Sequence, residues 1–203
     1  MRLLFLRHAE ASYQVDPSIV VGRADAAPLT ETGQAQAARA AEAARAWGLT
    51  AIHASTLRRA RDTVAPIAKT AGLPVIENPL LVERSQGDFE GRKKDDVYTP
   101  ERIKIVHADQ WRWRPPNGES LEDAAARMER FLGALAPEPE ARILVVTHLM
   151  MLWAVFRIAT GCDHAILPNL RVDNAALVEI DRPAAGSLKL LRWNVPASTV
   201  FAP

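Results

Sequence analysis

The stretch Leu3-Leu4-Phe5-Leu6-Arg7-His8 decides the fold class, because a short apolar run ends abruptly at a cation and an imidazole. The apolar residues suit a buried strand of an α/β sheet, since they lack the alternation of apolar and polar positions that marks a strand with one solvated face. In such folds, ligands bind in the crevice beyond the carboxyl ends of the strands. The sequence therefore places Arg7 and His8 at a predicted ligand site.

The composition is typical of a globular protein. The 203 residues suit a single domain spanning residues 1–203, with 48% hydrophobic and 24% charged residues. The net charge of +1 gives no reason to expect a polyanionic partner. Cys162 is the only cysteine, which excludes an internal disulfide and a CxxC metal site. No apolar stretch approaches the about 18–20 residues that span a membrane, and the first apolar run is too short for a secretory signal. We therefore expect a cytoplasmic protein without membrane association.

Strand-length apolar runs alternate with helical patterns along the chain, which is typical of parallel βαβ units. Pro66 is predicted to kink or interrupt one helix, and Pro100 is predicted to break another. The pattern indicates an α/β protein, a three-layer α/β/α domain with a mostly parallel sheet and helices on both faces. Strands are expected at residues 3–6, 51–54, 74–77, 143–147, 175–180 and 188–193. Helices are expected at residues 31–47, 56–72, 95–108, 121–135 and 149–159.

The stretch from residue 92 to residue 116 is the least regular part of the chain. A long polar insertion that carries aromatic residues is usually a lid or a substrate-facing segment. Its Trp111-Arg112-Trp113-Arg114 run is similar to the aromatic and cationic patches that bind single-stranded nucleic acid. One such run in a nearly neutral chain favours packing within a lid, and it leaves open a contact with the substrate beyond its phosphate. We therefore expect no nucleic-acid partner.

Two further strands end in residues that would complete a site around His8. The strand ending at Thr147 is followed directly by His148, and the second strand leads into a helix start with three arginines in residues 58–61. Parallel strands that end at one sheet edge can bring two imidazoles into one pocket. A helix N-terminus with guanidinium groups is a natural binding site for a phosphoryl dianion. These features indicate phosphoryl chemistry.

Six short motifs strengthen this interpretation by their order along the chain. They are Leu6-Arg7-His8-Ala9-Glu10, Gly22-Arg23-Ala24-Asp25 with Pro28-Leu29-Thr30, Ser55-Thr56-Leu57-Arg58-Arg59-Ala60, Leu81-Val82-Glu83 with Gly87-Asp88-Phe89-Glu90-Gly91, Pro116-Asn117-Gly118-Glu119-Ser120, and Val145-Val146-Thr147-His148. In this combination the sequence resembles the histidine phosphatase superfamily, which includes the cofactor-dependent phosphoglycerate mutases. The resemblance spans residues 6–148 and implies a phosphoglycerate mutase-like fold.

The resemblance implies roles for five residues. His8 would be the nucleophile that takes the phosphoryl group, while Arg7, Arg59 and His148 would hold the phosphoryl oxygens. Glu83 would protonate the leaving alcohol and then activate the water that hydrolyses phospho-His8. The cations near His8 would keep its imidazole neutral for attack, and they would neutralise the phosphoryl oxygens in the transition state. Arginine and histidine supply this charge, so we expect neither a metal nor another cofactor.

Other residues in the motifs leave choices open. Arg23 is a candidate for an additional substrate contact. Glu90 and Glu119 lie in neighbouring motifs and compete for the role of the acid. Leu149-Met150-Met151 follows the second histidine, where many family members have Gly-Gly or Gly-Asn. These larger side chains are expected to narrow the pocket or to shift the start of the following helix.

We predict a metal-independent phosphomonoester hydrolase that acts on a small phosphorylated metabolite through a phosphohistidine intermediate. The alternative enzyme is a phosphoglycerate mutase that interconverts 2- and 3-phosphoglycerate. Mutases of this family usually carry a longer insertion with an E-R-x-Y-G element after the acid motif, whereas Arg92-Lys93-Lys94-Asp95-Asp96 follows here, which favours the phosphatase. A catalytically inactive phosphate-binding scaffold is the alternative from another class. The natural substrate stays open, as does the oligomeric state, for which a homodimer is one option.

Overall fold

A six-stranded sheet forms the middle of the fold within residues 1–136 and 138–198, the part of the chain that the computed structural model describes. The strands are β1 (Arg2–Arg7), β2 (Ala51–Ala54), β3 (Val75–Glu77), β4 (Arg142–Thr147), β5 (Ala176–Asp181) and β6 (Lys189–Pro196). Their order is β3-β2-β4-β1-β5-β6. The first four of these are mutually parallel, whereas β5 runs antiparallel to both β1 and β6.

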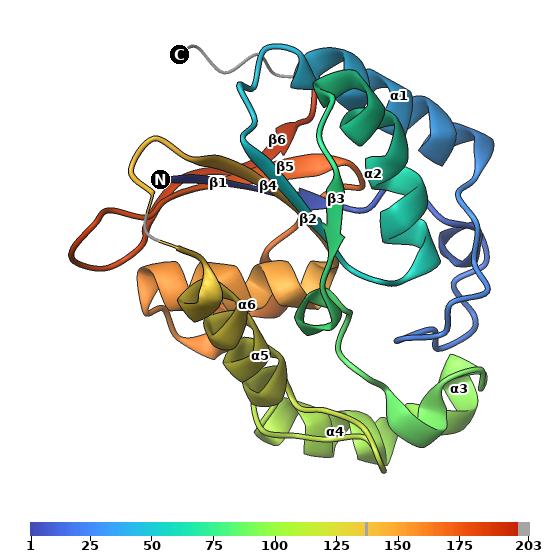
Figure 1. Ribbon diagram of the computed structural model, residues 1–203. Helices are drawn as coiled ribbons and strands as arrows, with labels where there is room; N and C mark the ends of the chain where they lie inside the picture. The colour runs from blue at the N-terminus through green and yellow to red at the C-terminus, as the bar shows by residue number, and fades with distance from the viewer. Residues whose placement is uncertain (137, 199–203) are drawn as a thin grey trace.

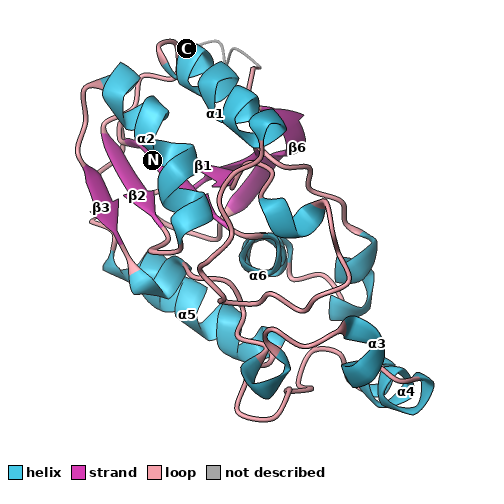
Figure 2. Ribbon diagram, turned by 90° about the vertical axis from the view of Figure 1, so that its right-hand side faces the viewer, coloured by secondary structure: helices cyan, strands magenta, loops and turns pink. Residues whose placement is uncertain are grey.

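Two pairs of helices cover the two faces of the sheet, as Figure 1 shows. One face carries α1 (Glu31–Ala44) and α2 (Arg58–Ala71), and the other carries α5 (Leu121–Ala134) and α6 (Leu149–Thr160). The short helices α3 (Lys94–Val97) and α4 (Pro100–Ala108) extend away from the sheet at one end of the molecule (Figure 2). The predicted α/β class and three-layer architecture are confirmed. Within the described residues, no helix is both long enough and apolar enough to cross a bilayer.

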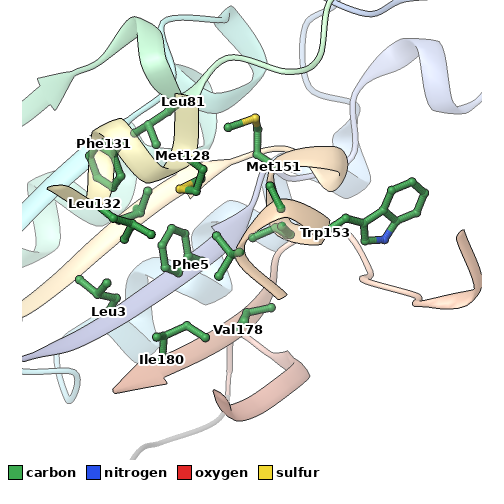
Figure 3. Close-up of a cluster of buried hydrophobic side chains, with 14 of the residues drawn as sticks. Leu3, Phe5, Leu81, Met128, Phe131, Leu132, Met151, Trp153, Val178 and Ile180 are labelled. Carbon is green, nitrogen blue, oxygen red and sulfur yellow. The ribbon is translucent and has the colours of Figure 1, made fainter. Parts of the chain in front are cut away.

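The central strand β1 shows how a continuous apolar run fills both layers. Successive side chains of a strand point to opposite faces. Leu3 and Phe5 therefore join the cluster beneath α5 and α6, while Leu4 and Leu6 join the cluster beneath α1 and α2. Figure 3 shows Leu3 and Phe5 among the side chains of α5, α6 and β5. Because both faces of the strand are buried, the chain leaves the sheet at a fixed position just before His8.

Capping residues fix the helix ends that the sequence predicts. The Thr30 hydroxyl accepts a hydrogen bond from the Gly33 N–H at 2.9 Å and starts α1. Ser120 and Asp123 form a reciprocal capping box that starts α5. Gly161 adopts a left-handed conformation, with φ of 66°, and ends α6.

Two details of the first helix pair differ from the predictions. Helix α1 ends at Ala44 and not at Trp47, because tighter turns follow and bury the Trp47 side chain completely. Helix α2 continues through Pro66, so the predicted interruption there is wrong. A proline removes one helical hydrogen bond. Burial of Val64 and Ile67 against the sheet offsets that loss and holds the helix together.

The segment 92–116 contains α3 and α4, separated by the expected break, and it packs its aromatic side chains inward. Trp111 is buried in the cluster beneath α5 and α6. The Trp113 ring contacts the rings of Phe89 and Tyr98, each at a centroid distance of 6.2 Å. The two arginines of the same run form ion pairs with surface carboxylates. The run therefore has the packing role that the sequence favours.

Candidate active site

Three strand ends meet at one edge of the sheet. β1 and β4 are parallel neighbours with Arg7 in register with Thr147, so His8 and His148 leave the sheet side by side. Their ring centroids lie 5.1 Å apart. β2 pairs with the other side of β4, which brings the start of α2, and with it Arg59, to the same edge. The topology thus brings both predicted histidines and the predicted arginine into one cluster.

The hydrogen bonds of His8 define its protonation. Its Nδ1 lies 2.7 Å from the carbonyl oxygen of Ala9, which can only accept, so Nδ1 carries the proton. The lone pair is therefore on Nε2, where the Tyr13 hydroxyl donates at 3.1 Å. The His8 N–H donates to the Thr147 carbonyl at 2.9 Å, which fixes the backbone. His8 is 1% exposed. Its unprotonated Nε2 is therefore held in one tautomer and one orientation.

His148 and Arg59 form a second buried pair. The Arg59 Nε–H donates to His148 Nδ1 at 3.3 Å, so this nitrogen is unprotonated. The proton on His148 Nε2 then donates to the Ser55 hydroxyl at 2.7 Å. The terminal nitrogens of Arg59 donate to the carbonyl oxygens of Gly22 and Ala24, at 2.8 and 3.2 Å. Arg59 therefore ties the loop after β1 to the second histidine.

Burial and neighbouring cations keep both histidines neutral. Burial is the largest cause that lowers the pKa of His8 well below its ordinary value, and the charges of Arg59 and Arg7 lower it further. The pKa of His148 is lowered well below its ordinary value for the same reasons, burial first and Arg59 next. Burial also raises the pKa of the Tyr13 hydroxyl, which stays a donor. At neutral pH, His8 therefore presents an unprotonated Nε2.

Arg7 completes the positive lining of the site. One terminal nitrogen donates to the Val172 carbonyl at 2.5 Å. Its Nε–H is buried and has no hydrogen-bond partner within the described residues. A buried donor without a partner is costly unless a ligand accepts its hydrogen bond. Arg7 lines the same cavity as Arg59, so an anion bound there can satisfy this group.

Of the three candidate carboxylates, Glu83 alone lines the cavity. Its two oxygens accept from the backbone N–H groups of Arg84 at 2.9 Å and Met150 at 3.4 Å. The carboxylates of Glu90 and Glu119 bind elsewhere, the former to the loop that follows Arg84. These contacts hold the Glu83 carboxylate in the same cavity as Arg7 and Arg59, as a proton donor to a leaving group would require.

Arg23, the predicted additional substrate contact, does not line the cavity. Its Nε donates to the Glu83 carbonyl at 2.9 Å, and its terminal nitrogen lies 2.6 Å from a Glu119 oxygen. Arg127 donates to the same carbonyl at 3.3 Å and to the second Glu119 oxygen at 3.0 Å. The arrangement makes Arg23 a support behind Glu83.

The cavity at this edge has a volume of about 350 Å³. Leu149 and Met150, which replace the smaller residues of many family members, contribute to its wall, and α6 still starts directly after His148. The lining residues are Arg7, Tyr13, Ile19, Val20, Val21, Gly22, Arg59, Glu83, Gln86, Lys94, Tyr98, Leu149 and Met150. Within residues 1–136 and 138–198, no group of three or more His, Cys, Asp or Glu side chains is placed to hold a metal ion.

Sequence reasoning assigned no role to Tyr13 or to Asn174, which both contact His8. Tyr13 lies in a 3₁₀ turn (Ser12–Gln14) that folds its ring back over the site, with the Arg59 guanidinium 5.4 Å from the ring centroid. Asn174 donates to the His8 carbonyl at 3.0 Å from a distant part of the chain. Tyr13 has no local pattern that would have identified it, whereas Asp173-Asn174-Ala175 weakly extends the resemblance to the family.

Comparisons with known proteins identify the family of this chain. The model of the histidine phosphatase superfamily (branch 1) matches residues 3–196. A probable phosphoglycerate mutase GpmB of Erwinia tasmaniensis is 32% identical over 185 residues, which cover 89% of this chain and 85% of that protein. A mycobacterial glucosyl-3-phosphoglycerate phosphatase in complex with VO3 has a similar structure, with a TM-score of 0.83, 30% identity and coverage of 96% of this chain and 98% of that chain. The α-ribazole phosphatase from Shigella flexneri gives a TM-score of 0.84 at 28% identity, with 100% of both chains covered. The chain belongs to the histidine phosphatase superfamily, branch 1.

Proposed function

We propose that this enzyme is a metal-independent phosphomonoester hydrolase that works through a phosphohistidine at His8. The observation that carries the proposal is the buried His8 ring, whose protonated Nδ1 leaves the Nε2 lone pair for attack. Arg7 and Arg59 place two cations in the cavity, and the Arg7 Nε–H has no hydrogen-bond partner within the described residues, so it is free to donate to a phosphoryl oxygen. A neutral nucleophile in a cationic pocket is suited to a phosphate dianion.

In the first step, His8 Nε2 attacks the phosphorus atom while the bond to the leaving oxygen breaks. Glu83, in its protonated form, gives its proton to the departing alcohol. The guanidinium groups of Arg7 and Arg59 neutralise the equatorial oxygens, where the charge is spread in the transition state. Tyr13 has to leave Nε2 before attack, because its hydroxyl occupies the place where phosphorus must come.

In the second step, water attacks the phosphorus of phospho-His8 and the nitrogen–phosphorus bond breaks. The Glu83 carboxylate, ionised by the first step, accepts a proton from that water and so returns to its starting form. Inorganic phosphate leaves, and the electron pair returns to Nε2. The same carboxyl group therefore serves as acid and then as base.

A phosphoglycerate mutase is the second candidate, because the curated relatives that match this chain include proteins named as mutases. The solved structures named above are phosphatases. The segment after Gly91 favours hydrolysis, since it lacks the E-R-x-Y-G element that the mutases of this family usually carry.

The experiment is a phosphate-release assay on purified protein with 4-nitrophenyl phosphate and a panel of phosphomonoesters, from acidic to neutral pH. We expect turnover that is lost in His8→Asn. A parallel assay measures conversion of 3- to 2-phosphoglycerate with bisphosphoglycerate present. If 3-phosphoglycerate is converted faster than phosphate is released from any ester, the protein is a mutase and the proposed hydrolase function is wrong. Absence of both activities in the wild type would make the protein a phosphate-binding scaffold.

A further inference from the structure

The cavity continues beyond the phosphoryl cluster along a predominantly apolar surface. Ile19 and Val21 from the loop after β1 line it, together with Leu149 and Met150 from the start of α6. These four residues form the apolar wall. The volume of about 350 Å³ equals that of about a dozen water molecules. This leaves room for a ring-sized group beside the phosphoryl group.

The polar groups near the apolar wall are largely engaged with the protein. The Gln86 amide oxygen accepts from the Arg84 guanidinium at 3.1 Å and from the Tyr98 hydroxyl at 2.8 Å. Both Glu83 oxygens accept backbone hydrogen bonds. Lys94, the remaining charged lining residue, is exposed to solvent. Lys94 and the Gln86 amide nitrogen are therefore the main lining donors left beside the apolar wall, and a sugar with several hydroxyl groups would lose more water contacts here than these two groups can replace.

Backbone hydrogen bonds hold the apolar wall in position. The Val20 N–H donates to the Arg92 carbonyl at 2.9 Å, and the Lys94 N–H donates to the Ser18 carbonyl at 2.7 Å. The Gly91 N–H donates to the Val20 carbonyl at 2.8 Å. The loop that carries Ile19 is thereby fixed to the segment that leads into α3. The wall is a formed surface and does not require ordering by a ligand.

Two further cavities adjoin this surface. One of about 320 Å³ shares Tyr13, Ile19 and Val21 with the site and is lined mainly by small apolar residues. Another of about 180 Å³ shares Tyr98 and Met150 with the site. Met150 lines both this cavity and the site, and its sulfur accepts a hydrogen bond from the Arg84 Nε–H at 3.2 Å. Its unbranched thioether side chain is suited to contact with apolar groups of varied shape.

We propose that the apolar wall binds the leaving group of the substrate, and that this group is an aromatic ring or a medium-length alkyl chain. The preferred substrates are then phosphate monoesters of apolar alcohols and not those of sugars or hydroxy acids. This inference rests on the proposed hydrolase function, and it specifies the substrate class of the same site. It assigns a separate role to residues that do not touch the phosphoryl group.

The test compares ethyl, butyl and hexyl phosphate with glycerol 1-phosphate as substrates. The alkyl alcohols have nearly equal acidity, so differences in kcat/KM report contact with the wall. We expect kcat/KM to rise by about fourfold for each methylene that becomes buried. Hexyl phosphate should exceed glycerol 1-phosphate by more than tenfold. A flat or falling alkyl series, or a preference for glycerol 1-phosphate, would overturn the inference.

Two isoleucine variants provide a matched comparison. Ile19→Asn places an amide on the apolar wall, and it should reduce the ratio of hexyl to glycerol phosphate turnover by about tenfold or more. Ile105→Asn makes the same change on α4 at a side chain that is 60% exposed and outside the cavity, and it should leave the ratio unchanged. Equal effects of both variants would contradict the assignment. If the wild type hydrolyses neither these esters nor 4-nitrophenyl phosphate, the proposed function itself is wrong.

Discussion

Replacing Arg59 by methionine removes a cation that several parts of the site share. Arg59 donates to His148 Nδ1 and to the Gly22 and Ala24 carbonyls, and its side chain is 2% exposed. Methionine occupies the path of the arginine stem, so the change removes charge and donors while filling much of the space. The variant therefore tests electrostatics and positioning rather than the packing of α2.

The expected loss of kcat/KM is about 10³–10⁵-fold, the range for an arginine that stabilises a phosphoryl-transfer transition state. This corresponds to about 4–7 kcal/mol at about 1.36 kcal/mol for each factor of ten. The unpartnered His148 Nδ1 should cost about 1–3 kcal/mol of folding stability, offset in part by removal of a buried cation. The charge of Arg59 lowers the pKa of both His8 and His148, so the acid limb of kcat/KM should move to higher pH.

The assay is steady-state hydrolysis of 4-nitrophenyl phosphate by the wild type, Arg59→Met and Arg58→Met, from acidic to neutral pH. Arg58 is the adjacent residue of α2, but it is exposed and pairs with Asp62 at 3.4 Å. An exposed pair contributes about 0–1 kcal/mol, so Arg58→Met should remain within a few-fold of the wild type. A loss below tenfold in Arg59→Met, or a comparable loss in Arg58→Met, would refute this account of the cation cluster.

Three further predictions concern the acid, the hydroxyl beside the nucleophile and the pH dependence of stability. Glu83→Gln should slow alkyl phosphates by about 10²–10⁴-fold, because their alkoxide needs a proton, but 4-nitrophenyl phosphate much less; equal slowing of both in steady-state kinetics would point to another acid. Tyr13→Phe removes the donor that vanadate must displace from His8 Nε2, so the Kd for vanadate measured by calorimetry should fall by about 2- to 12-fold, corresponding to about 0.5–1.5 kcal/mol; weaker binding would show that the hydroxyl holds the anion instead. The pKa of both histidines is lower in the fold than in the unfolded chain, so the unfolded chain binds more protons below about pH 6.5, and stability falls as pH drops. Each histidine contributes up to about 1.4 kcal/mol per pH unit to the slope of the unfolding free energy against pH in that range. Urea unfolding of His148→Gln should therefore show a slope that is smaller by the contribution of one histidine. A slope equal to that of the wild type would contradict a neutral His148.

The sheet and the meeting of the histidines follow from local patterns in the sequence. The apolar run that ends at Arg7 has the length and continuity of a strand buried on both faces, and the run ending at Thr147 has the same character. Parallel pairing of two such strands places the residues that follow them at one edge. The sequence therefore predicts that the two histidines can meet, and the pairing of β1 with β4 in the structure makes them neighbours.

The supporting contacts could not be predicted, because they depend on where loops fold in three dimensions. Tyr13 reaches His8 because a short 3₁₀ turn follows β1, and this turn has no strong sequence signal. Arg23 lies in a family motif, yet its guanidinium faces the Glu83 carbonyl and Glu119 behind the cavity. A motif identifies residue types and order, whereas the direction of a side chain is decided by its neighbours.

Helix ends show the same distinction on a smaller scale. Thr30 and Ser120 were predictable caps, because their hydroxyl groups need only the backbone of the next turn. The continuation of α2 through Pro66 depends instead on contacts with the sheet, which the local sequence does not contain. Local rules therefore determine where helices start better than they determine whether packing overrides a helix breaker.

The most direct test of the central claim is detection of the phosphoenzyme. The enzyme is mixed with a radiolabelled phosphomonoester, stopped in alkaline denaturant during turnover and digested, and the labelled peptide is identified by mass spectrometry. We predict a phosphoryl group on His8 that is stable in alkali, is released in acid and is absent from His8→Asn. A label on another residue, or undiminished hydrolysis by His8→Asn, would contradict covalent catalysis at His8.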